Sequence, residues 1–175
     1  MNKLTQLQRD ALKEALKLDG LSIEHKNTLK DILDSNKNNE IIPKLFVDGA
    51  ADLHSKTAGI GGVVYINEGE VANFSEPLYD KTNNESEYLS LIKGIQVIHE
   101  LKFDNVLIFS DSELIVKQVT GEYKIKNDRM KKLNDEVKLN LRKLTSWSID
   151  HVRREKNTRA DELSKLGMEE ARGSK

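Results

Sequence analysis

Four carboxylates, each set in a short motif of its own, are the side chains of this sequence best suited to chemistry. They are Asp48, Glu87, Asp111 and Asp161. We expect Asp48 and Asp111 to follow apolar strands, and Glu87 and Asp161 to lie near the starts of helices. Clustered carboxylates repel one another, whereas hard divalent cations bind several carboxylate oxygens at once. A fold that brings these four acids together therefore predicts a divalent metal site.

The two acids that follow strands also have purely structural explanations. Asp48 stands before Gly49, and an Asp-Gly pair commonly opens a turn between strands. Asp111 precedes a helix expected to begin at Ser112, so it could cap that helix, although Ser110 and Ser112 compete for the same position. Against these explanations, Asp48 and Asp111 would end strands that are neighbours in a parallel pair.

The two acids near helix starts could serve as capping residues. Glu87 lies three residues after Asn84, which is capping-box spacing, but Thr82 with Glu85 has the same spacing and would leave Glu87 free. Asp161 likewise lies three residues after a threonine. All four acids nevertheless fall at strand ends or helix starts of one expected α/β sheet. Ligands of such sheets bind in the crevice beyond the carboxyl ends of the strands.

The apolar pattern predicts two units. Residues 1–40 read as a helical hairpin that ends in a polar linker, residues 41–170 as a separate unit, and residues 171–175 as a loose tail. In the second unit the strands are expected at 44–47, 58–66, 71–78, 105–109 and 147–152, and the helices at 82–101, 112–120, 130–144 and 158–168. This order predicts an α/β fold with a five-stranded mixed sheet, in which three antiparallel strands precede parallel ones and helices cover both faces.

The composition excludes several classes of protein. The chain has no cysteine, so it has no disulfide framework and no thiolate metal site, which fits a cytoplasmic location. It has no apolar run long enough to cross a bilayer and no signal-peptide pattern, so we expect no membrane partner. The formal net charge is −1, yet residues 116–144 carry nine Lys and Arg against four Asp and Glu. A basic patch beside an acidic cluster is typical of nucleic-acid enzymes, although solvated helices look similar.

The sequence resembles the type 1 ribonuclease H family over about residues 44–170. The matching motifs lie, in family order, at residues 46–50, 58–61, 82–88, 110–112 and 157–163. The resemblance is to the short cellular branch, because residues 121–127 lead directly into the long helix without the basic helix and loop of bulkier members. It implies a ribonuclease H-like fold and an endonuclease that hydrolyses the RNA strand of RNA–DNA hybrids.

The resemblance also implies a role for each acid. Asp48, Glu87, Asp111 and Asp161 would ligate two Mg²⁺ ions, with Mn²⁺ as a substitute, for in-line hydrolysis that leaves 5′-phosphate and 3′-hydroxyl ends. Residues expected to contact the hybrid are Gly49, Ala50, Asn83, Asn84, Ser112, Lys124, Lys126, Arg154 and Asn157. Asn83 and Asn84 suit 2′-hydroxyls and base edges, or they cap their helix. Arg154 stands where many members carry a loop histidine.

Two other functions stay open at this point. One is a DNA-acting nuclease or strand-transfer enzyme of the same fold, and the other is a non-catalytic module that binds hybrids. The N-terminal helices lack the aromatic and Gly/Pro-rich pattern of the family's hybrid-binding domain. They are expected to pack or self-associate, or to contact nucleic acid modestly through Lys13, Lys17 and Lys26. The sequence does not determine the oligomeric state.

Overall fold

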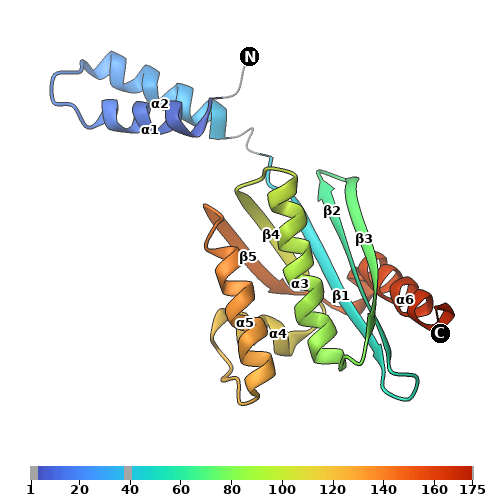
Figure 1. The fold of residues 1–175 in the computed structure, drawn as a ribbon. Coiled ribbons are helices and arrows are strands. Elements are labelled where there is room, and N and C mark those ends of the chain that lie inside the picture. The colour runs from blue at the N-terminus through green and yellow to red at the C-terminus, as the bar shows by residue number, and fades with distance from the viewer. Residues whose placement is uncertain (1–3, 38–40, 175) are drawn as a thin grey trace. The chain divides into compact units, whose positions relative to one another are not determined.

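The computed structural model describes residues 4–37 and 41–174 (Figure 1). The chain divides into two compact units, Met1–Ile41 and Ile42–Lys175. Among the described residues, no helix is both long and apolar enough to cross a bilayer.

The first unit is a pair of helices, α1 (Gln6–Leu16) and α2 (Ile23–Lys37), that pack on each other. Thr5 and Gln8 form a capping box at the start of α1. None of the side chains described in this unit is buried, and Leu7 is 81% exposed. The expected self-association of these helices stays a prediction.

The second unit is built on a five-stranded mixed sheet, as expected. Its strands are β1 (Lys44–Asp52), β2 (Thr57–Ile66), β3 (Gly69–Tyr79), β4 (Asn105–Ser110) and β5 (Ser146–His151), in the spatial order β3-β2-β1-β4-β5. The first three strands pair antiparallel, and β4 pairs parallel with both β1 and β5. The central strand β1 therefore joins the antiparallel half of the sheet to the parallel half.

Four helices cover the two faces of this sheet. They are α3 (Asn83–Glu100), α4 (Glu113–Thr120), α5 (Asp128–Leu141) and α6 (Thr158–Gly173), and a short 3₁₀ turn (Arg154–Lys156) precedes α6. Figure 1 shows α6 on the opposite face of the sheet from α3. The core beneath α3 is fully buried and aliphatic, with Leu45 and Val47 packed against α3 at Gly94.

Several boundaries differ from expectation, and two of these differences change how residues were interpreted. Strand β1 was expected to end at Val47, but it runs on to Asp52 because it stays paired with β2 along its whole length. Asp48 therefore lies inside a strand, and its explanation as a turn residue is wrong. Helix α6 continues to Gly173, with Ala171 fully buried and Arg172 Nη2 at 2.8 Å from Asp52 Oδ2. Residues 171–173 are therefore not a loose tail.

Two glycines of β2 bring α6 unusually close to the sheet. A Cβ on Gly61 would lie 2.2 Å from the backbone nitrogen of Ser164, and a Cβ on Gly59 would lie 2.2 Å from the backbone oxygen of Ser164. Real Cβ atoms do not approach backbone so closely, so α6 can sit at this depth only because both positions lack a side chain. Helix α6 carries Asp161, and its depth therefore sets the position of the fourth acid.

We predict that Gly61→Ala lowers the free energy of unfolding by about 1–3 kcal/mol, because the added methyl group pushes α6 off the sheet. Denaturant unfolding of the variant measures this loss. Gly69→Ala is the matched control, since its Cβ would meet only the backbone oxygen of Ile66, at 3.7 Å. Equal stability of the two variants would show that α6 does not depend on this close approach.

Candidate active site

The register of β1 and β4 places two of the acids side by side. The two strands pair in parallel, and the last paired residues are Val47 and Ser110. Asp48 and Asp111 each come one residue later, at the point where the strands cease to pair. Ser112, not Asp111, takes the N-cap position of α4, and its side chain forms no capping bond. The expected parallel pair is confirmed, and Asp111 follows β4, but Asp48 does not follow β1, because that strand runs on to Asp52.

Glu87 reaches the same point from α3. Thr82 and Glu85 form the capping box: the Glu85 amide donates to Thr82 Oγ1 at 3.3 Å, and the Thr82 amide donates to Glu85 Oε2 at 2.9 Å. The box leaves Glu87 free for another role. Carboxylate oxygens of Asp48, Glu87 and Asp111 all lie within 4.8 Å of one another.

Gly49 explains how α3 comes close enough. A Cβ on Gly49 would lie 2.3 Å from the backbone nitrogen of Glu87, so this position admits no side chain. The interpretation of Gly49 as a turn residue is wrong, because β1 continues past it. Its absence of a side chain serves the contact between β1 and α3.

Burial and repulsion by neighbouring acids both act on Asp48 and Glu87. Burial, and then repulsion by Asp111 and Asp161, raises the pKa of Asp48 to about 6, although a hydrogen bond from Ser164 opposes the rise. Burial, and then repulsion by Asp48 and Asp111, raises the pKa of Glu87 to about 9. The positive charge of Arg154 opposes both rises, but burial and the neighbouring acids outweigh it.

One oxygen of the cluster has no partner at all. Glu87 Oε2 is buried and forms no hydrogen bond with any residue that the structure describes. Buried polar atoms are nearly always satisfied, so an orphaned carboxylate oxygen among other carboxylates calls for an explanation. Three hard oxygen donors converging on one point match the ligand preference of Mg²⁺ and similar cations. The residues present therefore fit a divalent metal ion.

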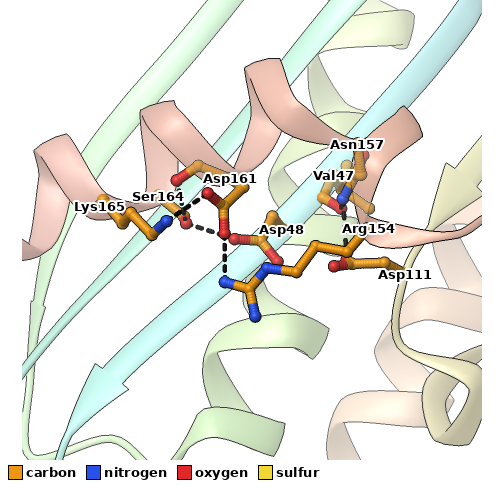
Figure 2. Close-up of polar contacts among 8 residues, drawn as sticks. All are labelled: Val47, Asp48, Asp111, Arg154, Asn157, Asp161, Ser164 and Lys165. Atoms are coloured by element: carbon orange, nitrogen blue, oxygen red, sulfur yellow. Dashed lines mark hydrogen bonds and ion pairs between the residues drawn. The ribbon is translucent and has the colours of Figure 1, made fainter.

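The fourth acid stands beside this cluster but is already paired with cations (Figure 2). Asp161 Oδ1 accepts a hydrogen bond from Arg154, and Asp161 Oδ2 accepts one from Lys165. Burial acts to raise the pKa of Asp161, but Lys165 and Arg154 outweigh it and hold that pKa below its ordinary value. Asp161 repels Asp48, so the two lie near each other. To bind a metal, Asp161 would have to release at least one of its cations.

Asn157 does not lie where a nucleic acid could reach its side chain. It is 1% exposed, and its Nδ2 donates to the Val47 carbonyl oxygen at 3.0 Å and to Asp111 Oδ1 at 2.8 Å. The amide thus ties Val47, within β1, to the acid that follows β4, as Figure 2 shows. The expected hybrid contact of the Asn157 side chain is wrong, and its observed role is to orient Asp111.

Two residues of the site were missed in the sequence. The Ser164 hydroxyl contacts both Asp48 Oδ2 and the Asp161 carbonyl oxygen, and Lys165 pairs with Asp161. They lie three and four residues after Asp161, which puts all three on one face of α6. That helical spacing was a signal present in the sequence.

A groove with both polar and apolar lining lies between the helix start before Glu87 and the segment after α4. Its lining includes Thr82, Asn84, Leu114, Gln118, Lys124 and Lys126. Asn83 and Asn84 are exposed, and their side chains form no hydrogen bond in the described part of the chain. Since the capping box uses other residues, the capping explanation of this pair is wrong. Three of the expected hybrid contacts therefore share one groove.

The raised pKa of Glu87 predicts how stability depends on pH. Between the unfolded value near 4.5 and the folded value of about 9 the folded chain binds more protons than the unfolded chain, so metal-free stability falls as pH rises through this window. We predict that Glu87→Gln flattens this dependence and, at pH 8 in EDTA, adds at least about 1.4 kcal/mol, the equivalent of one pKa unit.

Thermal and denaturant unfolding in EDTA between pH 5 and pH 9 measures this effect. Glu100→Gln is the matched control, because Glu100 is an exposed glutamate on the same helix. Parallel pH profiles for the wild type and the Glu87 variant would contradict the account of a repulsive cluster.

Comparison with known proteins agrees with this geometry. A family model described as reverse transcriptase-like matches residues 46–167. The Ribonuclease HI of Halobacterium salinarum is 30% identical over 127 residues, which are 72% of this chain and 64% of that protein. This chain thus spans slightly less than two thirds of that curated relative.

Solved structures give the same result. The crystal structure of RNase H1 from Halobacterium salinarum matches with a TM-score of 0.71 at 29% identity, over 74% of this chain and 98% of that one. LC11-RNase H1, solved in complex with an RNA/DNA hybrid, matches with a TM-score of 0.69 at 30% identity, over 74% of this chain and 98% of that one. From the matched model, the shared fold and the cluster that its motifs form, we conclude that the chain belongs to the type 1 ribonuclease H family.

Proposed function

We propose that this chain is an endonuclease that hydrolyses the RNA strand of RNA–DNA hybrids. The observation that carries the proposal is the group of three carboxylates within 4.8 Å of one another, one of which has a buried oxygen without a partner. Family membership supports it, and LC11-RNase H1 is a family member that binds such a hybrid. The products would carry 5′-phosphate and 3′-hydroxyl ends.

Asp48, Glu87 and Asp111, joined by Asp161, would hold two Mg²⁺ ions, or Mn²⁺ in their place. When bound, such a pair supplies a Lewis acid that activates water and stabilises the leaving oxygen. The protein's own part is to keep the carboxylates in place before the metal arrives. Asn157 orients Asp111, and burial excludes bulk water from Glu87.

The remaining contacts are proposed from position and chemistry. Asn83 and Asn84 offer free amides to 2′-hydroxyls, the group that distinguishes RNA from DNA. Lys124 and Lys126 are exposed beside them and would meet the phosphates of the hybrid. Arg154, with a side chain that is 70% exposed, could move from Asp161 to a phosphate once a metal neutralises that acid. Gly49, Ala50 and Ser112 stay proposed as backbone or hydroxyl contacts beside the cluster.

We predict that Asp111→Asn reduces hybrid cleavage by at least about a hundredfold without loss of the fold. The asparagine can still accept the hydrogen bond from Asn157, but it contributes no negative charge to a cation. The assay incubates a labelled hybrid, duplex RNA and duplex DNA with wild type and variant, in Mg²⁺, in Mn²⁺ and in EDTA. Asp104→Asn is the control, because Asp104 is an exposed aspartate just before β4.

The outcomes separate the three candidate functions. Metal-dependent cutting of the hybrid alone supports the proposal. Cutting of duplex DNA would favour the DNA-acting nuclease, and tight binding without cutting would favour a binding module. Near-full cleavage by the Asp111 variant would refute the assignment of the acids.

We predict that the double variant Lys124→Gln with Lys126→Gln weakens hybrid binding at low salt. The slope of log affinity against log salt should also become shallower, by about one for each lysine that meets a phosphate. Fluorescence anisotropy over a salt series measures both quantities. Lys138→Gln with Lys143→Gln removes the same charge near the other end of α5 and should leave the slope unchanged; equal slopes for the two double variants would show that the groove does not bind phosphate.

A further inference from the structure

A buried polar node joins the three helices that surround the groove. Tyr88, Gln118 and Asn134 come from α3, α4 and α5, and they are 0%, 9% and 2% exposed. The Tyr88 hydroxyl donates to Gln118 Oε1 at 2.9 Å and accepts from Asn134 Nδ2 at 3.1 Å. One hydroxyl thus uses both its donor and an acceptor site, and it links residues 30 and 46 positions away along the chain.

Each of the three residues lies on a helix that also contributes to the proposed site. Tyr88 directly follows Glu87 on α3. Gln118 itself lines the groove, and α4 begins just after Asp111. Asn134 lies on α5, whose first turn contributes Met130 to the same groove. The node therefore joins the helix that carries Glu87 to the groove and to α5.

Apolar packing alone does not fix these helices to one register. Hydrophobic burial is non-directional, and α4 is only eight residues long. Buried hydrogen bonds are directional, and an unsatisfied buried partner is costly, so a fully satisfied network favours a single arrangement. A sliding or rotating α4 or α5 would leave Gln118 or Asn134 without a partner.

We propose that Tyr88 is a positioning residue for hybrid binding. Its hydroxyl holds α4 and the start of α5, and with them Lys124 and Lys126, in a fixed register against the helix that carries Glu87. This inference rests on the proposed function, because it concerns the groove that would grip the hybrid. Productive cleavage requires the phosphate backbone to be held at a set distance from the acids, and small misplacements are costly.

The first test is Tyr88→Phe, which removes a single oxygen. We expect the KM for a labelled hybrid to rise roughly fivefold, the factor that one neutral hydrogen bond carries, and kcat to stay within about twofold. Amide hydrogen exchange should quicken in residues 121–130, and calorimetric Mn²⁺ affinity should not change. Tyr65→Phe is the matched control, because its hydroxyl forms no hydrogen bond in the described part of the chain.

A second variant separates position from stability. Tyr88→Phe combined with Asn134→Leu replaces both members of the Tyr88–Asn134 hydrogen bond by apolar groups, which recovers the stability lost at that pair without restoring a directional contact. A KM that stays raised while the melting temperature recovers supports the proposal. A KM that returns to the wild-type value together with stability would overturn it, as would an unchanged KM in the single variant.

Failure of the proposed function gives a different result. If the wild type neither binds nor cleaves the hybrid, that function fails, and hydrogen exchange then tests the node by itself. Faster exchange confined to residues 121–130 supports the fixed register, and unchanged exchange in Tyr88→Phe overturns it.

Discussion

Electrostatic repulsion among buried carboxylates is the constraint on which the site depends. Asp48, Glu87 and Asp111 lie within 4.8 Å of one another, and in the part of the chain that the structure describes none of the three forms a salt bridge, although the charge of Arg154 acts on Asp48 and Glu87. Burial disfavours the negative charges of Asp48 and Glu87 most, and repulsion between acids at such distances adds to the cost. The raised pKa values of Asp48 and Glu87 are the direct consequence. A divalent ion bound among these oxygens would offset this cost, which gives a physical reason for gathering the three acids.

Strand pairing, helix packing and one buried amide hold the acids together against this repulsion. Parallel pairing of β1 with β4 aligns Asp48 and Asp111, because the ladder ends one residue before each of them. The lack of a side chain at Gly49 lets α3 bring Glu87 to the same point. Asn157 completes the arrangement by bonding to Val47 of β1 and to Asp111, which follows β4. Backbone register, close helix contact and one buried amide thus oppose the repulsion, which is how a folded chain can prepare a site before its ligand binds.

Much of this could be predicted from the sequence, because the signals were local. Alternating and helical apolar patterns predicted the order of strands and helices, and three of the four acid motifs contribute carboxylates that the fold brings together. The position of Asp48 inside a strand could not be read, since an Asp-Gly pair carries a strong turn signal and only pairing with β2 overrides it. The burial of Asn157 could not be predicted either, because it depends on contacts with Asp111 and Val47, which lie 46 and 110 positions away in the sequence.

The most direct test of the central claim is calorimetric titration of Mn²⁺ into the metal-free chain at pH 7, in two buffers of different ionisation enthalpy. A metal displaces the protons of its ligands, and Glu87, with a pKa of about 9, carries one at this pH. The account predicts binding with release of about one proton for each chain. Absence of binding, or binding with no difference between the buffers, would contradict it.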